Sequence, residues 1–404
     1  MGAAYSVNRL IRRKMKVLWI CGLPNVVRLK ATNRVLSDTP TAAWSWILGH
    51  LPPPRDVELH IVCPVGGLVE SRVDFDYGGA HWHCFRRERF ELFFLWRRFA
   101  CKIRSFVHKL APDVIHGWGG ETGCGLVATY LTKKAVVSVQ GLLLMLFWQW
   151  FKLKSERPKI NFKTRIMWLC EKSTYRRANI LLVESAASQA GLKKHYGYDS
   201  VIIPHPLRRE FLEADLSIRD RLVLAPIKFL YLGSLIARKG AIDALKAFAM
   251  LSRDESKLVM IGEGEDRSVI EDIISQTRLT DRVELCGTLS ADEITKEFLS
   301  AQFFLLPSYG DTGPTALKEA LASGLYPICY RNSGPEDLIM HYGCGELVST
   351  GDIVALSETM NRCASAVSDC VRHSFLVSSG VRSELSPNVI WSQLKKIYAK
   401  QEPA

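Results

Sequence analysis

The feature that most constrains this chain is an alternation of short apolar runs with longer amphipathic segments. Short runs rich in β-branched and aromatic residues predict strands, and the amphipathic segments predict helices. In the first half we expect helices at 42–51, 90–110 and 185–195, and strands at 17–21, 57–63, 114–116, 135–139, 180–183 and 201–204. Strands that alternate with helices form a parallel sheet with helices on both faces.

The second half repeats the alternation. We expect helices at 241–251, 268–277, 292–300 and 314–322, and strands at 228–232, 258–261, 283–285, 303–306 and 326–329. The fold class is therefore α/β, with two doubly wound Rossmann-like domains at 1–206 and 207–385. Residues 386–404 contain a final helix that we expect to cross back to the first domain. Ligands bind beyond the carboxyl ends of such strands, so two facing domains would share one cleft.

Positive charge is concentrated in the first half. Residues 1–210 carry 33 Lys and Arg against 15 Asp and Glu, whereas the net charge of the whole chain is +12. Segments 86–109 and 152–177 hold much of the excess beside aromatic residues. Cations interleaved with aromatic side chains suit an anionic membrane surface, which we expect the first domain to bind. A solvated basic face over buried aromatics is the alternative. No nucleic-acid-binding motif accompanies the charge, so we expect no nucleic-acid partner.

No segment predicts a membrane span. The apolar run 17–23 is too short for one and lacks a small-residue cleavage site, so we interpret it as a strand rather than a signal peptide. The stretch 135–151 is interrupted by Ser, Gln and Gly. Eleven scattered cysteines without a CxxC pair are typical of reduced thiols. We expect a cytoplasmic protein that is peripheral on the inner face of the membrane.

The segment DTGPTALKEALASG, residues 311–324, directly follows a predicted strand. Pro314 suits the first position of a helix, and Gly313 would let a ligand approach the backbone closely. The amides from Thr315 onward, with the helix dipole, would form an anion site. Helical side chains lean toward the N-terminus, so Glu319 would reach the same crevice as Asp311. The pattern predicts a site for phosphate and hydroxyl groups, which a sugar nucleotide has. A capped surface helix with a solvated Glu319 is the alternative.

Three other strand ends lead into glycine-containing loops. The segment GSLIARKG contains Ser234, Arg238 and Lys239, and a Lys at this place can neutralise a diphosphate leaving group. The next strand end, IGEGEDR, contains Gly262 and Gly264. A third strand end carries Gly287, where a base could dock on backbone groups.

The order of GSLIARKG, IGEGEDR, DRVELCGTLS and DTGPTALKEALASGLYPI resembles the donor domain of the family 4 retaining glycosyltransferases, which have the GT-B fold. The resemblance covers residues 228–340 well and the first half more loosely. It implies that Glu319 binds the nucleotide ribose and that Asp311 binds hydroxyls of the donor sugar. Backbone amides around Gly313, Pro314 and Thr315 would meet the sugar or diphosphate. It also places Lys239 at the diphosphate, and we expect Lys239, Asp311 and Glu319 to be the catalytic residues.

Several positions depart from the family pattern. Ser234 replaces an Arg that holds the diphosphate, so phosphate binding must be weaker or supplied elsewhere, with Arg238 as a substitute. Gln140 stands where the family often has a His. We expect Gln140, His116 and Thr41 to lie on the acceptor side, with a structural His116 as the alternative.

We expect neither a metal site nor a cofactor. Asp74 and Asp76 have the DxD pattern of a different glycosyltransferase fold, and His81 and His83 offer ring nitrogens. Both groups lie away from the donor motifs, and a pair two residues apart on a strand is easily structural. The nucleotide sugar would act as a co-substrate.

The resemblance implies a retaining, metal-independent, hexosyltransferase-type enzyme. We expect it to move a sugar from a nucleotide-sugar donor to a carbohydrate acceptor that belongs to a lipid-linked, cell-envelope or exopolysaccharide glycan. In this family the leaving diphosphate is thought to deprotonate the acceptor, so the protein mainly positions substrates and stabilises phosphate charge. The alternatives are a sugar-nucleotide epimerase of similar fold and a non-catalytic sugar-nucleotide-binding subunit.

Overall fold

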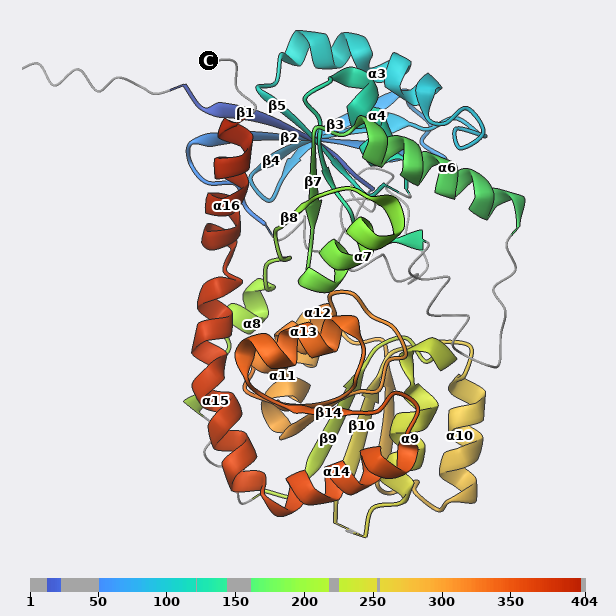
Figure 1. The fold of residues 1–404 in the computed structure, drawn as a ribbon, viewed down its shortest axis with the longest axis vertical. Helices are drawn as coiled ribbons and strands as arrows, with labels where there is room; N and C mark the ends of the chain where they lie inside the picture. The colour runs from blue at the N-terminus through green and yellow to red at the C-terminus, as the bar shows by residue number, and fades with distance from the viewer. Residues whose placement is uncertain are drawn as a thin grey trace, which may run out of the picture.

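Two α/β domains stand one above the other in the computed structural model, which describes residues 13–22, 51–120, 122–143, 161–217, 225–252 and 255–400 (Figure 1). Each domain is built on its own sheet, and helices cover the sheets. The two doubly wound domains predicted from the sequence are confirmed.

The first domain has an eight-stranded sheet in the described part of the chain, with the order β3-β4-β2-β1-β5-β6-β7-β8. Neighbouring strands are parallel except β3 and β4, which form an antiparallel hairpin at one edge. Six strands match the predictions, and the two strands of the hairpin were not predicted. The strands are β1 (Met15–Ile20), β2 (Val57–Val65), β3 (Arg72–Tyr77), β4 (Ala80–Arg86), β5 (Val114–Trp118), β6 (Val136–Ser138), β7 (Ile180–Val183) and β8 (Val201–Ile202).

The helices of the first domain differ from the predictions in two ways: α4 and α6 were not predicted, and the helix predicted at 90–110 begins later. The structure does not begin a helix at residue 90, because Phe90, Leu95 and Trp96 have φ angles of 66°, 46° and 60°, which an α-helix excludes. The predicted helix at 42–51 lies outside the described residues, apart from its last position. The helices are α3 (Arg97–Leu110), α4 (Cys124–Leu131), α6 (Phe162–Arg177) and α7 (Ala186–Tyr196).

The second domain has a six-stranded, all-parallel sheet among the described residues, with the order β11-β10-β9-β12-β13-β14. All strands except the three-residue β14 match the predictions. The strands are β9 (Lys228–Leu232), β10 (Lys257–Ile261), β11 (Val283–Gly287), β12 (Phe303–Leu306), β13 (Tyr326–Tyr330) and β14 (Glu346–Val348). The helical segments are α8 (Arg209–Glu213), η2 (Ala237–Lys239), α9 (Ala241–Ala249), α10 (Arg267–Gln276), α11 (Ala291–Ser300), α12 (Thr315–Ala322), α13 (Ser333–Tyr342), α14 (Ile353–Ser365), α15 (Val367–Glu384) and α16 (Pro387–Ala399).

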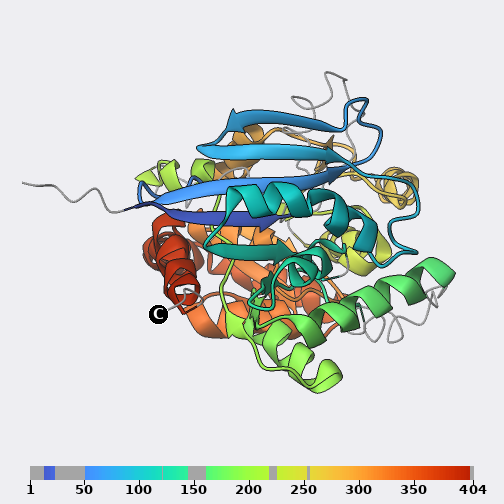
Figure 2. The ribbon, with the colours of Figure 1, turned by 90° about the horizontal axis from the view of Figure 1, so that it is seen from above.

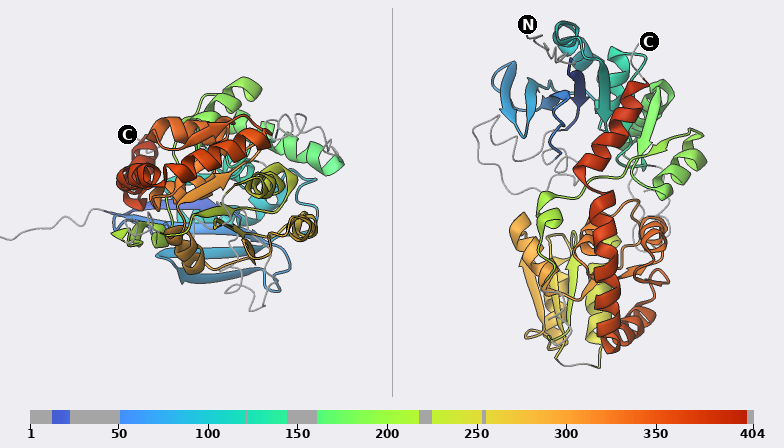
Figure 3. Two further views of the ribbon diagram at one scale, coloured as in Figure 1. Left: turned by 90° about the horizontal axis from the view of Figure 1, so that it is seen from below. Right: turned by 90° about the vertical axis from the view of Figure 1, so that its left-hand side faces the viewer.

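The last two helices run along one side of both domains (Figure 3). Helix α16 lies beside β1 of the first domain (Figure 2). Trp391 of α16 stacks on Trp19 of β1 with ring centroids 5.3 Å apart, and the Trp19 indole N–H donates to the Tyr398 hydroxyl at 3.0 Å. The C-terminal helix therefore completes the apolar core of the first domain.

The strand order of each sheet places one loop pair at a topological switch point. In the second sheet β9 lies between β10 and β12, so the chain leaves β9 toward one side and leaves β12 toward the other. The crevice between two such diverging loops is where doubly wound sheets bind ligands. The loops in question are 233–240 after β9 and 307–314 after β12.

Candidate active site

The two loops at the switch point of the second sheet meet through an ion pair. Lys239 closes η2 after β9, and its Nζ lies 2.5 Å from Oδ2 of Asp311 in the loop after β12. Gly240 makes this approach possible, because a Cβ there would lie 1.9 Å from the Pro307 carbonyl oxygen and its φ is 71°. The two residues that the sequence analysis places at the donor phosphate and sugar are thus in contact.

Arg238 and Ser234 lie on the same loop as Lys239. The Arg238 guanidinium donates to the Gly310 carbonyl at 2.8 Å, and the Tyr309 amide donates to the Arg238 carbonyl at 2.9 Å. Arg238 therefore fastens the loop after β9 to the loop after β12. Ser234 is exposed at the start of the turn, and its carbonyl accepts from the Tyr231 hydroxyl at 3.0 Å.

Three of the four predicted donor-side glycines allow neighbouring loops to pack on one another. A Cβ at Gly262 would lie 2.0 Å from the Gly233 carbonyl oxygen, and a Cβ at Gly264 would lie 2.1 Å from that of Leu235. Gly287 has a φ of 65°, and its carbonyl accepts from the Gly262 amide at 2.8 Å. A side chain at Gly262 or Gly264 would displace the backbone of the neighbouring loop, and at Gly287 the left-handed φ disfavours any other residue.

Helix α12 begins at Thr315, one residue later than predicted, with Pro314 as its N-cap residue. Gly313 precedes it, and a Cβ there would lie 2.6 Å from the carboxyl carbon of Glu184 in the first domain. The N-terminus of α12 therefore faces the first domain across a close contact, in which a side chain at position 313 would displace the Glu184 carboxylate.

Glu319 does not point into an open crevice. Its carboxylate is buried and accepts two hydrogen bonds from the Arg208 guanidinium, at 2.6 Å to Oε1 and 2.9 Å to Oε2. Arg208 lies in the linker between the domains, just before α8. Burial raises the pKa of Glu319, and the guanidinium opposes that rise. The expected ribose contact of Glu319 stays a prediction, and the sequence analysis missed its partner.

Glu184 is a second residue that the sequence analysis missed. It directly follows β7, is buried, and accepts a hydrogen bond from the Thr312 hydroxyl at 2.9 Å. Its Oε2 lies 3.2 Å from Nδ1 of His205 in the linker. Burial raises the pKa of Glu184 to about 7 and lowers that of His205 to about 3, so His205 is neutral near pH 7. An acid at the carboxyl end of a buried strand is the signal that could have identified it.

Lys318 of α12 is also buried near the contact between the two domains, which we call the interdomain seam and which includes Glu184, Thr312 and Gly313. Its Nζ has no hydrogen-bond partner among the described residues, and burial lowers its pKa. Its charge favours the ionised form of Glu184 and so opposes the rise in the pKa of that carboxyl. Four charged side chains from both domains thus influence one another electrostatically: Glu184, Asp311, Lys239 and Lys318.

The predicted acceptor-side residues divide into three cases. Thr41 lies outside the described residues. Gln140 borders a small cavity beyond the ends of β5, β6 and β7, and its side-chain oxygen is buried without a partner in the described structure. His116 does not face the cleft, because it is completely buried. Its Nδ1 lies 2.7 Å from the Tyr398 hydroxyl and its Nε2 2.8 Å from Ser138 Oγ, and burial lowers its pKa to about 3. It is a core histidine.

The DxD and histidine pairs belong to the edge hairpin. Nδ1 of His83 lies 3.0 Å from Asp74 Oδ1, and Nδ1 of His81 lies 2.6 Å from Asp76 Oδ1. Arg72 also donates to Asp74. Among the described residues, no group of three or more His, Cys, Asp or Glu side chains is placed to hold a metal ion.

Two family models match the chain. The model described as "Glycosyltransferase Family 4" matches residues 49–211, and the one described as "Glycosyl transferases group 1" matches residues 218–366. Together they cover both domains.

Curated relatives match over shorter stretches. The amylovoran biosynthesis glycosyltransferase AmsK of Erwinia amylovora is 30% identical over 191 residues, 45% of this chain and 47% of that protein. A GDP-mannose-dependent alpha-mannosyltransferase of Corynebacterium glutamicum is 29% identical over 42% of this chain and 38% of that protein. The chain thus spans less than half the length of these relatives.

Solved structures match over nearly the whole chain. Sucrose-phosphate synthase from Thermosynechococcus elongatus superposes with a TM-score of 0.75 at 15% identity, covering 95% of this chain and 98% of that one. Anabaena HepE in complex with UDP superposes with a TM-score of 0.70 at 15% identity, covering 96% of this chain and 100% of that one. At this identity the likeness concerns the fold.

Proposed function

This chain belongs to the group 1 glycosyltransferases of family 4 and has their GT-B fold, and on that basis we propose that it transfers a sugar from a nucleotide-sugar donor to a carbohydrate acceptor. The observation that carries the proposal is the Lys239–Asp311 ion pair at the switch point of the second sheet. A cation and a carboxylate at that place match the two polar parts of the donor, its diphosphate and its sugar hydroxyls.

Donor binding would separate the ion pair. The Lys239 ammonium would turn to the diphosphate and stabilise the charge that develops as the bond to the sugar breaks. Asp311 would accept hydrogen bonds from sugar hydroxyls. Arg208 occupies two of the roughly four acceptor positions of the Glu319 carboxylate, and the remaining positions would serve the ribose.

We infer retention of the anomeric configuration and independence from metal ions from the family resemblance. Lys239 supports the second point, because an ammonium group at the diphosphate supplies the charge stabilisation that a metal ion supplies in other sugar transferases. Hexose transfer fits the names of relatives such as the mannosyltransferase of Corynebacterium glutamicum.

The acceptor is proposed to be a cell-envelope or exopolysaccharide glycan, held on a lipid. Among the relatives are the amylovoran glycosyltransferase and the putative teichuronic acid biosynthesis glycosyltransferase TuaC of Bacillus subtilis, whose names concern extracellular polymers. Such an acceptor would place the enzyme at the cytoplasmic surface of a membrane.

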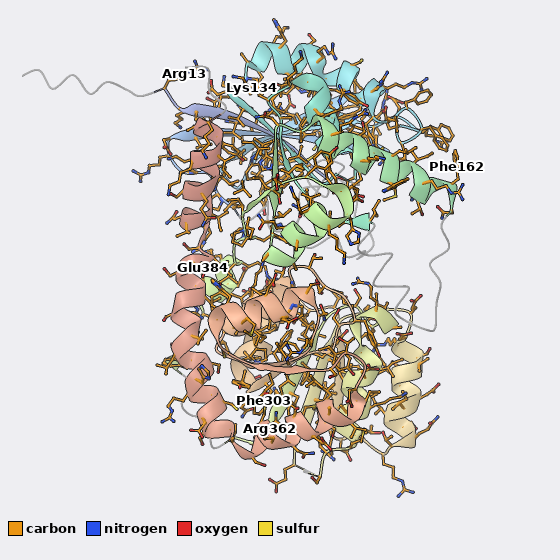
Figure 4. The ribbon with its side chains drawn as sticks, viewed as in Figure 1. Arg13, Lys134, Phe162, Phe303, Arg362 and Glu384 are labelled. Carbon is orange, nitrogen blue, oxygen red and sulfur yellow. The ribbon has the colours of Figure 1, made fainter. Side chains whose placement is uncertain are left out.

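The first domain carries a surface suited to a membrane. Phe90, Phe93 and Phe162 are 67%, 55% and 66% exposed, and Phe93 contacts both of the others with ring centroids 5.8 and 5.9 Å apart. Figure 4 shows Phe162 at the outer end of α6, at the rim of the molecule. Exposed cations accompany them on the same segments: Arg86, Arg87, Arg89, Arg97, Arg98, Lys163 and Arg165. No helix among the described residues has the length and apolarity that a bilayer span requires.

Liposome co-sedimentation tests the membrane surface. We expect the protein to bind vesicles that contain phosphatidylglycerol, to bind pure phosphatidylcholine vesicles less, and to lose binding in the Phe93→Ser, Phe162→Ser double variant. Leu376→Ser is the control, because Leu376 is 69% exposed but lies on α15, in the second domain. Equal binding to both vesicle types, or no binding, would contradict this part of the proposal.

Nucleoside diphosphate release tests the transferase. The purified protein is incubated with UDP-glucose, GDP-mannose, ADP-glucose and TDP-glucose, and the free diphosphate is measured. We expect release from one donor and a loss of about a hundredfold or more in Lys239→Ala, by analogy with deletion of one charge-stabilising donor. Lys246→Ala, at an exposed position of α9, should retain the rate. Absence of release from every donor, or an equal rate in Lys239→Ala, would refute the proposal.

A further inference from the structure

The side chain of Asn332 is turned away from its own helix. Asn332 is the N-cap residue of α13, where an asparagine usually accepts a hydrogen bond from a main-chain amide of the first helical turn. In the structure, which describes all of α13, its side chain makes no such bond. It reaches instead to the loop after β12, which carries Asp311. A side chain that forgoes a favourable local contact indicates a role in that loop.

The Asn332 side-chain amide bonds to main-chain groups at both ends of a gap between two loops. Its Oδ1 accepts from the Asp311 main-chain amide at 3.2 Å. Its Nδ2 donates to the Ser308 carbonyl at 2.6 Å and to the Tyr330 carbonyl at 3.2 Å. Asn332 therefore ties the end of β13 to the loop after β12 at two points, and one of these points is Asp311 itself.

Gly334 holds the Asp311 main chain from the same side. The Gly334 amide donates to the Asp311 carbonyl at 2.9 Å, and a Cβ at position 334 would lie 2.5 Å from that carbonyl oxygen. The segment 332–334 thus bonds both the amide and the carbonyl of Asp311. The backbone from which the carboxylate projects is fixed by these bonds, while the carboxylate itself meets Lys239 on the loop after β9.

We propose that Asn332 is a positioning residue that sets where the Asp311 carboxylate lies against the donor sugar. This inference rests on the proposed function, in which Asp311 accepts hydrogen bonds from sugar hydroxyls. Hydrogen bonds weaken steeply when their geometry departs from the optimum, so a shift of the Asp311 backbone would weaken sugar binding. Lys239 and Glu319 would hold the nucleoside diphosphate, and Asn332 makes no hydrogen bond to either of them in the described structure.

The test measures the binding of two ligands by isothermal titration calorimetry. One is the nucleotide sugar, among UDP-glucose, GDP-mannose, ADP-glucose and TDP-glucose, that raises the thermal midpoint of wild type. The other is the matching nucleoside diphosphate. The quantity compared is the dissociation constant of the nucleotide sugar divided by that of the nucleoside diphosphate, which isolates the contribution of the sugar.

Gln302→Ala is the matched control for Asn332→Ala. Gln302 is another side-chain amide of the second domain that bonds main-chain groups, since its Oε1 accepts from the Lys228 amide at 2.8 Å and its Nε2 donates to the Pro226 carbonyl at 3.4 Å. It directly precedes β12, so it lies at the opposite end of that strand from Asp311. Loss of this amide should lower stability without moving the donor site.

We expect Asn332→Ala to weaken binding of the nucleotide sugar about tenfold or more, the scale of a hydrogen bond to a charged group, and binding of the nucleoside diphosphate less than about threefold. Gln302→Ala should leave the ratio unchanged even where it lowers the thermal midpoint. In an Asp311→Ala background Asn332→Ala should not raise the ratio further, because a positioning residue acts only through its target. Asn332→Ser is measured alongside, because serine is a favourable N-cap residue and supports folding.

An unchanged ratio in Asn332→Ala, or an equal loss of affinity for both ligands, overturns this inference alone. Where Asn332→Ala does not fold, Asn332→Ser decides: a raised ratio supports the inference and an unchanged ratio overturns it. A rise that persists in the Asp311→Ala background also overturns it, because Asn332 then acts through another group. If Asp311→Ala itself leaves the ratio unchanged, the proposed contact of Asp311 with the sugar is wrong together with this inference. No midpoint shift in wild type with any of the four nucleotide sugars overturns the proposed function as well.

Discussion

The two sides of the interdomain seam are built from different kinds of contact. On the donor side, Lys239 and Asp311 belong to two loops of one sheet and pair with each other. On the other side, Glu184 has its partners in the linker and in the opposite domain, at His205 and Thr312. The donor side is therefore preorganised within one domain, whereas the first-domain side is assembled only when the domains and linker are together.

The Lys239–Asp311 pair depends only on loops within one domain, whereas the Glu184 contacts depend on how the two domains are placed. A change on the donor side should act on the donor loops without altering how the domains meet. A change at Glu184 should alter the stability of the protein, the pH dependence of that stability and the contact between the domains together. The following four experiments test that distinction in order of decreasing expected effect.

The largest effect is expected at the linker. Arg208→Ala would leave the Glu319 carboxylate buried without its partner, which costs about 3–5 kcal/mol in comparable buried ion pairs. Urea unfolding measures the loss. Arg209→Ala is the control, because the neighbouring Arg209 pairs with Glu213 on the exposed surface and should change stability by less than about 1 kcal/mol. Equal effects of the two variants would contradict the buried pairing.

The second experiment follows the proton on Glu184. Burial raises the folded pKa of Glu184 to about 7 from its ordinary value of 4.5, so between these pH values the native state holds a proton that the unfolded state has released. This contribution to stability is fully present below pH 4.5 and disappears as pH rises through 7. We expect wild type to lose about 3 kcal/mol relative to Glu184→Gln across that range, from the linkage between pKa and stability. Parallel pH curves in urea unfolding would contradict the assignment.

The third experiment disturbs the donor side alone. Gly240→Ala would place a methyl group against the Pro307 carbonyl and force a residue with a side chain into a left-handed conformation. We expect about 1–3 kcal/mol of destabilisation and weaker nucleotide binding, as for overpacked sites. Gly380→Ala on α15 is the control, because a Cβ there meets no atom within 4 Å and alanine favours helices. Unchanged nucleotide binding in Gly240→Ala would show that the packing of Gly240 against Pro307 does not shape the donor site.

The smallest effect on activity is expected far from the seam. Tyr398→Phe removes the hydroxyl that accepts from Trp19 and contacts His116, so two buried polar groups lose a partner. A loss of about 1–3 kcal/mol is expected, with diphosphate release unchanged when the variant is folded. A slower rate in folded Tyr398→Phe would show that His116 takes part in the reaction after all.

Much of the fold follows from the sequence because buried parallel strands are short apolar runs, as at 303–306 and 180–183. The edge strand β3 was missed because charged and aromatic residues alternate along it, and β14 because it has only three residues. A structural His116 was the alternative prediction, but its hydroxyl partner Tyr398 could not be predicted, because it lies 282 positions away in the sequence.

The candidate site also has parts that local sequence predicts and parts that it does not. Asp311 and Lys239 were predicted from glycine-rich loops at strand ends, a pattern that local sequence records. The Arg208–Glu319 pair joins residues 111 positions apart, and the Glu184–Thr312 contact joins residues 128 positions apart. Neither contact leaves a local pattern, because each depends on how the linker brings the two domains together.

The most direct test of the account is a thermal-shift titration with UDP-, GDP-, ADP- and TDP-sugars on wild type and Lys239→Ala. A ligand that binds the native state alone raises its stability by mass action, about 2.7 kcal/mol at a hundred times its dissociation constant. We predict that one nucleotide class raises the midpoint of wild type and raises that of Lys239→Ala far less. No shift with any class, or the same shift in both proteins, would contradict a donor site at the Lys239–Asp311 pair.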